Sequence, residues 1–262
     1  AFWGRLAEAD MANEAFSTAA IAWYLAYRDR KSFGGYLVFF LICFLGAHAK
    51  GLATIAVPFL AVLTDLILNR KFRFHCNWKA VAALAVGLGA YMIPFELSKA
   101  VAPAISPATQ SVIDGDGTVK TSGIALALRE NIIRYFAPFD HKEPFYSYFI
   151  HVPRLTLPWS PILILAVIDA ILLRRTLGRN EKWLCWSMIV IFLFFTISGS
   201  KRHYYILPLI PYCAILCALF LTRESPVRWI EKTKEILLKL YRIIPIAGLA
   251  ILFLAGVVLI LF

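Results

Sequence analysis

The stretch Gly51–Leu97 reads GLATIAVPFLAVLTDLIL (51–68), NRKFRFHCNWK (69–79) and AVAALAVGLGAYMIPFEL (80–97). Two apolar runs of 18 residues flank a short segment that carries four Lys and Arg residues. A helix needs about 20 mostly apolar residues to cross a bilayer, and basic residues gather in the loops on the cytoplasmic side. The stretch therefore predicts two transmembrane helices that are joined in the cytoplasm.

Outward from this stretch, six further runs have a similar length and apolar character. They are Ala12–Tyr27, Phe33–His48, Pro158–Leu173, Trp183–Ser198, Tyr204–Thr222 and Ile243–Phe262. The pattern predicts an all-α integral membrane protein with about eight transmembrane helices.

The distribution of positive charge predicts the orientation of these helices. If the spans alternate, one set of connections carries 17 of the 27 Lys and Arg residues, including those of 28–31, 70–79, 174–182 and 223–242. The positive-inside rule places this set in the cytoplasm. The segment Ser98–Leu157 then forms one long outer loop. We expect a multi-pass protein of the inner (cytoplasmic) cell membrane.

Composition excludes a soluble domain. The 262 residues are 60% hydrophobic and have a mean hydropathy of +0.72, which is too apolar for a globule of this size. The net charge of +11 indicates contact with anionic lipids, and we expect no nucleic-acid partner. The five cysteines contain no CxxC pair and indicate no disulfide framework.

The chain opens at Ala1 without a Met and ends inside an apolar run, which indicates an internal fragment of a longer protein. We expect a membrane core over 1–222 that includes the outer loop 98–157. The remainder, 223–262, is predicted to hold a basic cytoplasmic helix and the final span.

That basic helix is predicted over Pro226–Arg242, because Ser225-Pro226 is a favourable helix start. We expect it to lie along the cytoplasmic leaflet, with Lys232, Lys234 and Lys239 facing anionic headgroups. Its predicted role is anchoring.

The outer loop is too long and too aromatic for a passive connection. Within it, Ser122 is a candidate N-cap for an interfacial helix that runs to Tyr135. Asp114 and Asp116 resemble the start of a calcium loop, but the remaining ligands of that motif are missing.

Ionisable residues gather at the predicted outer ends of the spans, where they are costly unless paired, hydrated or used. They fall in four places: Asp10, the turn His48–Lys50, the loop segment 134–143 and the segment Lys201–His203. Each alone is explained by snorkelling to the interface. Together they predict a site for an anionic ligand at the outer surface.

Four segments resemble one family in the same order along the chain: RLAEADMANEAF (5–16), HAKGLATIAVPFLAVL (48–63), RYFAPFDHKEPFYSYF (134–149) with LPWSPIL (157–163), and FTISGSKRHYYILPLIPYCAIL (195–216). The family is the C-type superfamily of membrane glycosyltransferases that use lipid-linked sugars. It includes the protein O-mannosyltransferases and the aminoarabinose transferases of lipid A.

The resemblance implies transfer of a sugar from a polyprenyl phosphate to a lipid A, glycolipid or protein acceptor outside the cytoplasmic membrane. It implies a catalytic role for Asp10, the family's second acidic residue, whereas the principal acid would lie upstream of this chain. It also implies that a basic and aromatic set binds the donor: Lys50, Arg134, His141, Lys142, Tyr146, Tyr148, Lys201 and Arg202. No metal ligands are predicted, and whether a loosely bound divalent metal acts as a cofactor is left open.

Two other classes of function stay open at this point. A transporter or flippase of an anionic lipid or lipid-linked sugar would use the same cations along a path. Against it, the charges lie at one face of the membrane and no paired broken helices are evident. A non-catalytic assembly subunit is the third possibility.

Overall fold

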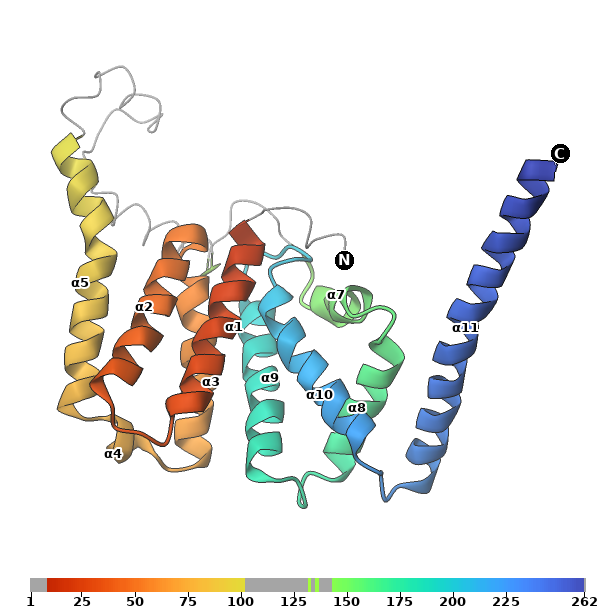
Figure 1. Ribbon diagram of the computed structural model, residues 1–262. Coiled ribbons are helices and arrows are strands. Elements are labelled where there is room, and N and C mark those ends of the chain that lie inside the picture. Colours follow the sequence, from red (N-terminus) through yellow and green to blue (C-terminus); the bar gives the residue numbers. More distant parts are fainter. Residues whose placement is uncertain (1–8, 102–131, 133–134, 137–142, 262) are drawn as a thin grey trace. The chain divides into compact units, whose positions relative to one another are not determined.

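The computed structural model describes residues 9–101, 132, 135–136 and 143–261, and the secondary-structure elements in this part of the chain are all helical (Figure 1). The predicted all-α class is therefore confirmed. The chain forms two compact units. Unit 1 comprises 1–152 and 186–211, and unit 2 comprises 153–185 and 212–262. The predicted boundary between 222 and 223 stays a prediction.

Unit 1 is built on helices that follow the apolar runs closely. They are α1 (Ala9–Tyr27), α2 (Phe33–Lys50), α3 (Ala53–Leu68), the short α4 (Phe72–His75) and α5 (Trp78–Val101). The C-terminal part of α9 (Arg179–Ile197) and a 3-10 turn (Leu207–Leu209) complete it, and α7 (Ser147–Leu155) lies mostly in this unit.

Turn chemistry fixes both ends of α2. The Ser32 hydroxyl accepts a hydrogen bond from the Gly35 N–H and caps the first turn. At the other end Gly51 has a φ of 87°, a conformation that glycine adopts without steric cost, and its N–H closes the helix on the Ala47 carbonyl. Lys50 is therefore held in the last turn of α2, at the start of the tight connection to α3.

The three helices α1, α2 and α3 pack closely because Gly46 has no side chain. A Cβ atom at Gly46 would lie 2.3 Å from Thr54 and 2.6 Å from Phe16. Nearby, Tyr24 of α1 packs on Phe39 and Cys43 of α2 in the core of this unit. The close approach brings the start of α1 next to the end of α2, and these ends carry Asp10 and Lys50.

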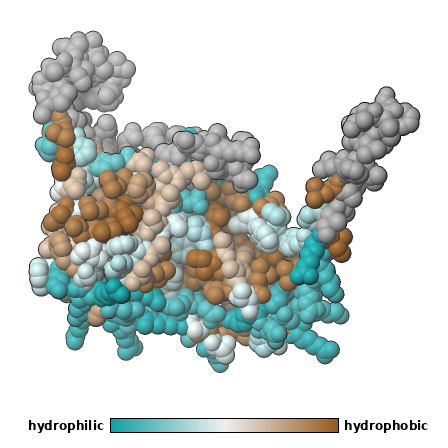
Figure 2. Space-filling view, viewed as in Figure 1, coloured by the Kyte–Doolittle hydropathy of each residue, from teal (hydrophilic) through white to brown (hydrophobic). Residues whose placement is uncertain are grey.

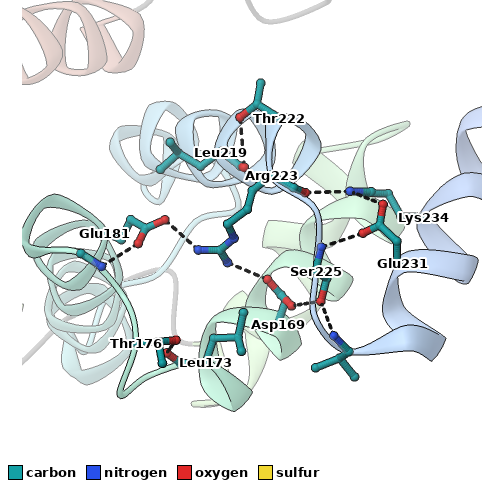
Figure 3. A network of polar contacts seen from close by, with 12 residues as sticks. Asp169, Leu173, Thr176, Glu181, Leu219, Thr222, Arg223, Ser225, Glu231 and Lys234 are labelled. Atoms are coloured by element: carbon teal, nitrogen blue, oxygen red, sulfur yellow. Dashed lines mark hydrogen bonds and ion pairs between the residues drawn. The ribbon is translucent and has the colours of Figure 1, made fainter.

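Unit 2 contains α8 (Ser160–Leu172), the first part of α9, α10 (Ile210–Thr222) from Tyr212 onward and α11 (Arg228–Leu261). A polar network joins their ends (Figure 3). The buried Asp169 of α8 accepts from the Arg223 guanidinium at 2.7 Å and from the Ser225 hydroxyl at 2.6 Å, and Arg223 also pairs with Glu181 at 2.9 Å. The acidic residue inside an apolar run is thus neutralised by a neighbouring segment.

By length and hydropathy alone, α2, α5 and α9 qualify as membrane-spanning helices in the described residues. A fourth span results if α7 and α8 count as one bent span. The helices α3 and 207–222 are apolar but shorter. The predicted span over Tyr204–Thr222 begins later than expected, since Pro208 and Pro211 limit the backbone hydrogen bonding that precedes α10. The count of eight spans stays a prediction.

The C-terminal region differs from the prediction. A separate basic helix over Pro226–Arg242 followed by a new span is wrong, because α11 continues without interruption from Arg228 to Leu261 (Figure 1). The sequence between Arg228 and Ile244 contains no Gly or Pro to end the helix, and Pro245 is accommodated inside it.

The prediction that Lys234 faces lipid headgroups is also wrong. Its side chain is 5% exposed, and the ammonium donates to the Arg223 carbonyl at 2.8 Å and pairs with Glu231 at 2.8 Å (Figure 3). Lys234 also lies over the Phe220 ring at 5.3 Å. Lys232 and Lys239 are exposed, as expected. The difference arises because Lys234 lies on the side of α11 that packs within unit 2.

Much of the predicted outer loop lies outside the described residues. This applies to Ser122, Asp114 and Asp116, and to most of the helix predicted to follow Ser122. Of that segment the structure describes Ile132 and Tyr135, both helical.

Candidate functional site

Unit 1 contains a cavity of about 620 Å³, which is within the size range of small-molecule sites. Its wall combines the first turns of α1, the α2–α3 connection, the end of α9 and the described residues before α7. The lining residues are Asp10, Asn13, Ala49, Lys50, Leu52, Ala53, Ala56, Ile132, Tyr135, Phe136, Phe194, Phe195, Ser198, Ser200 and Tyr205.

Asp10 and Lys50 form an ion pair in this wall. The Lys50 Nζ atom donates to Asp10 Oδ2 at 2.8 Å, although the residues are 40 positions apart in the chain. Asp10 is 5% exposed, and its other carboxylate oxygen, Oδ1, is buried and has no hydrogen-bond partner among the described residues. A buried acceptor without a donor is costly, so Oδ1 is suited to receive a hydroxyl or ammonium group of a ligand.

Two aromatic rings lie beside the Lys50 ammonium. Nζ is 5.0 Å from the centroid of Tyr205 and 5.9 Å from that of Tyr204. Cations are attracted to the faces of such rings, more strongly where water is partly excluded. Asp10, Tyr204 and Tyr205 together hold the ammonium at the cavity while its side chain is still 26% exposed.

The segment before α7 is fixed to α9 by Tyr135. Its hydroxyl donates to the Phe194 carbonyl at 2.8 Å, its ring stacks on Phe194 with centroids 5.0 Å apart, and its carbonyl accepts from the Gly199 N–H at 2.7 Å. Phe136, next in sequence, is 77% exposed. The cavity therefore has an aromatic side formed by residues that are distant in the sequence.

Lys201 and Arg202 are close to this wall but do not line the cavity. Lys201 is 6% exposed and donates to the Ser198 carbonyl at 2.5 Å. The Arg202 guanidinium donates to the Tyr204 hydroxyl and lies 5.7 Å from the centroid of that ring. In this arrangement the two cations hold the 198–205 segment in place.

The two tyrosines predicted to contact a sugar differ in environment. Tyr146 is 50% exposed, whereas Tyr148 is fully buried and packs against Phe195 and His151. Burial raises the pKa of the Tyr148 phenol above its ordinary value. The neighbouring His151 pairs with Glu143 at 2.9 Å. Tyr148 thus lies in the core, and Tyr146 is the accessible ring.

Three predicted binding residues, Arg134, His141 and Lys142, lie outside the described residues. Sequence reasoning also missed two residues of the cavity wall. Asn13 is 2% exposed and lies one helical turn after Asp10, where the i, i+3 spacing could have indicated it. Tyr205 was part of a recognised motif, but its position beside Lys50 depends on tertiary structure.

Within the described part of the chain, no group of three or more His, Cys, Asp and Glu residues is arranged to hold a metal ion. A divalent metal therefore stays a hypothesis. The cavity offers instead one ammonium group, one carboxylate oxygen open to a donor, and aromatic faces. This combination suits a ligand with a negative charge, polar hydrogens and an apolar part.

No protein-family model matches the chain. Curated relatives do. An undecaprenyl phosphate-alpha-4-amino-4-deoxy-L-arabinose arabinosyl transferase of Enterobacter sp. (strain 638) is 30% identical over 192 residues, which is 72% of this chain and 31% of the relative. A second relative, from Sodalis glossinidius (strain morsitans), has the same name with the number 1 added. It is 28% identical over 195 residues, which is 73% of this chain and 32% of the relative. The chain is similar to these transferases over more than two thirds of its own length. The resemblance inferred from the four motifs is confirmed.

A solved structure has a similar fold. ArnT from Cupriavidus metallidurans, bound to undecaprenyl phosphate, matches with a TM-score of 0.64 and 22% identity over 89% of this chain and 40% of that chain. The chain spans about a third of the length of the curated relatives that it matches.

Proposed function

We propose that the protein to which this chain belongs transfers a sugar from a polyprenyl phosphate to a lipid acceptor at the outer face of the cytoplasmic membrane. The observation that carries the proposal is the Asp10–Lys50 pair in the wall of the 620 Å³ cavity, with Asp10 Oδ1 open to a donor. The relatives that share this part of the chain are named as transferases of 4-amino-4-deoxy-L-arabinose from undecaprenyl phosphate.

The chemistry of such a transfer fits these two side chains. The bond between the anomeric carbon and the phosphate oxygen breaks, a bond to an acceptor oxygen forms, and polyprenyl phosphate departs with added negative charge. Lys50, partly desolvated beside two tyrosines, is suited to stabilise that charge. An ammonium has three donors, so Lys50 can keep its bond to Asp10 while it binds a phosphate oxygen.

Asp10 has a second use in this proposal. Its Oδ2 atom orients Lys50, and its Oδ1 atom accepts a hydrogen bond from a hydroxyl or ammonium group of the sugar. An aminosugar would supply a charge-assisted hydrogen bond to this carboxylate. Asn13, in the same wall, adds a neutral amide for a further sugar hydroxyl. The substrate class that this wall favours is an aminosugar on a lipid phosphate.

The test is a transfer assay with the purified full-length protein in proteoliposomes, with undecaprenyl phosphate-linked aminoarabinose and lipid A, read by mass spectrometry of lipid A. We expect transfer by the parent and a loss of about a hundredfold or more in Lys50→Ala, because one pre-organised charge contact is removed. Lys232→Ala, which changes an exposed lysine of α11, is the matched control and should keep the parental rate.

Equal transfer by both variants would contradict the site. Movement of the lipid-linked sugar across the bilayer without any modified acceptor would favour the transporter alternative.

A further inference from the structure

Unit 1 contains a second cavity, of about 430 Å³, at the ends of α1, α2 and α3 that lie next to α4. Most of its wall is apolar and aromatic, with Phe39 and Phe40 of α2 facing Phe59, Val62 and Leu63 of α3. The polar wall residues include three tyrosines, two arginines and a histidine: Tyr24, Tyr27, Tyr36, Arg28, Arg30 and His75. The proposed transfer chemistry uses none of them.

Tyr24, Arg28 and Tyr36 are engaged with other protein groups. The Tyr24 hydroxyl donates to the buried Asp65 at 2.7 Å, and Asp65 also pairs with Arg28 at 3.4 Å. The Tyr36 hydroxyl lies 3.1 Å from both His75 Nδ1 and Asn77 Nδ2. In the part of the chain that the structure describes, the remaining ring nitrogen, His75 Nε2, is buried and has no hydrogen-bond partner, and His75 is 9% exposed.

The hydrogen-bond chain determines which nitrogen of His75 carries the proton. Asn77 Oδ1 accepts from the backbone N–H groups of Lys79 and Ala80 at 3.0 and 3.2 Å, which fixes the amide orientation. Asn77 Nδ2 then donates to Tyr36, and Tyr36 donates its own proton to His75 Nδ1. A neutral imidazole with Nδ1 as acceptor is protonated at Nε2.

The ring is held neutral by its surroundings. Burial and the nearby Lys71 ammonium lower the pKa of His75 below its ordinary value. The Arg28 backbone acts in the opposite direction on this pKa, but Nε2 has no hydrogen bond to it. His75 therefore presents an N–H donor in the wall of an apolar cavity, and burial of a donor without an acceptor is unfavourable. A ligand with an oxygen acceptor at this end of the cavity would relieve that cost.

The rim of the cavity is positively charged. The connecting segments 28–32 and 69–79 carry seven Lys and Arg residues and one acidic residue, Asp29. Hydrophilic residues gather below the ends of α1, α2, α3 and α5, under the apolar surface of these helices (Figure 2). By the positive-inside rule this is the cytoplasmic side, where anionic lipids attract basic residues.

We propose that this cavity binds an acyl chain of an anionic glycerophospholipid of the cytoplasmic leaflet. The chain lies between α2 and α3, an oxygen of the glycerol-phosphate head accepts from His75 Nε2–H, and the phosphate charge lies near Arg28 and Arg30. The two cavities share Ala56 and Phe194 in their walls, but the polar groups used here take no part in the proposed transfer chemistry.

A rival occupant is the tail of the polyprenyl phosphate, because Ala56 and Phe194 line both cavities. A polyprenyl tail carries no oxygen along its length, so it would leave His75 Nε2–H without an acceptor. The tail is also uncharged, so it makes no ionic interaction with the Lys and Arg residues of the rim. The donor at His75 and the charge of the rim therefore favour the phospholipid.

The test uses the full-length protein in nanodiscs that contain phosphatidylglycerol with a photoreactive diazirine in one acyl chain, or the matching phosphatidylcholine. After illumination, cross-linked peptides are mapped by mass spectrometry. We expect phosphatidylglycerol to label the peptides of Phe39–Phe40 and Phe59–Leu63, and to do so several-fold more than phosphatidylcholine.

Three variants make the result specific. Val62→Phe fills the cavity and should reduce this labelling about tenfold. Ile67, on the same helix, is 58% exposed and does not line the cavity, so Ile67→Phe should leave the labelling unchanged. His75→Phe keeps an aromatic ring but removes the donor, and a loss of up to about tenfold is expected for one hydrogen bond.

Several results would overturn the proposal: labelling that is unaffected by Val62→Phe and His75→Phe, equal labelling by the two phospholipids, or no labelling of these peptides. Loss of the phosphatidylglycerol label on addition of polyprenyl phosphate, with a diazirine-bearing polyprenyl phosphate labelling the same peptides, would assign the cavity to the donor tail instead.

Discussion

Lys50 lies between a carboxylate and two aromatic rings, and this environment sets what its ammonium can do. The Asp10 carboxylate compensates its charge in the resting cavity, and Tyr204 and Tyr205 limit its mobility. An approaching lipid phosphate meets an ammonium that is already oriented, so little reorganisation is needed. In the proposed reaction, the Asp10–Lys50 pair therefore lowers the cost of orienting the ammonium toward the phosphate.

Asp10 and Lys50 are expected to act as a unit in sugar transfer. Asp10→Asn should lower the transfer rate at least tenfold, because Lys50 loses its charged partner and the sugar loses an acceptor. The double variant Asp10→Asn/Lys50→Met should lose less activity than the product of the single losses, since the two residues are in direct contact. Strictly multiplicative losses in transfer assays would contradict a coupled pair.

Asn13 is expected to contribute to sugar binding without a role in bond cleavage. Asn13→Leu should raise KM for the donor up to about tenfold, the cost of about one hydrogen bond, with kcat nearly unchanged. Ser17→Ala, one turn further along α1, removes a hydroxyl that donates to Asn13 Oδ1 at 3.4 Å and does not line the cavity, and it should change KM little. A fall in kcat with an unchanged KM in Asn13→Leu would argue for a different role.

At the scale of elements, the network at the start of α11 is a buried connection and not a lipid anchor. Lys234→Met should destabilise the protein by about 3 kcal/mol, because Glu231 and the Arg223 carbonyl lose a buried partner. Lys232→Met, two residues earlier on the exposed side, should change stability by no more than about 0.5 kcal/mol. Thermal unfolding in detergent measures both.

An equal effect of the two substitutions would contradict this distinction. It would instead support the expectation from sequence, in which Lys232 and Lys234 have the same role at a membrane surface.

The elements differ in how far the sequence could predict them. The ends of α2 follow local signals, the Ser32 cap and Gly51, and the predicted run Phe33–His48 ends within two residues of the helix. The continuity of α11 was missed because a change from basic to apolar composition resembles a boundary, although no residue there breaks a helix. The burial of Lys234 depends on packing against Phe220, which no periodicity encodes.

The site shows the same limit. Sequence motifs identified Asp10 and Lys50 as candidates, because ionisable residues at the ends of apolar runs are costly. They could not predict the 2.8 Å contact between them, since it depends on how closely α1 and α2 approach at Gly46. They also could not separate Tyr146 from Tyr148, one exposed and one buried, because the two side chains differ only in tertiary environment.

For the whole molecule, the predicted topology places Cys76 in the cytoplasm and Tyr146 outside. Cys76 is exposed beside α4, so it serves as a native probe. In intact cells, an impermeant maleimide should label a Tyr146→Cys variant and should leave Cys76 unlabelled until the membrane is permeabilised. Labelling of Cys76 in intact cells would reverse the orientation and remove the outer site.

The central claim is that the cavity at Asp10 and Lys50 holds the phosphate of the lipid donor. A cryo-EM structure of the full-length protein with undecaprenyl phosphate measures this most directly. The account predicts a phosphate oxygen about 2.8 Å from Lys50 Nζ, with Lys50 still bonded to Asp10 and the phosphate inside the cavity lined by Tyr135 and Phe194. A phosphate bound elsewhere, with Lys50 contacting only Asp10 and the two tyrosines, would contradict it.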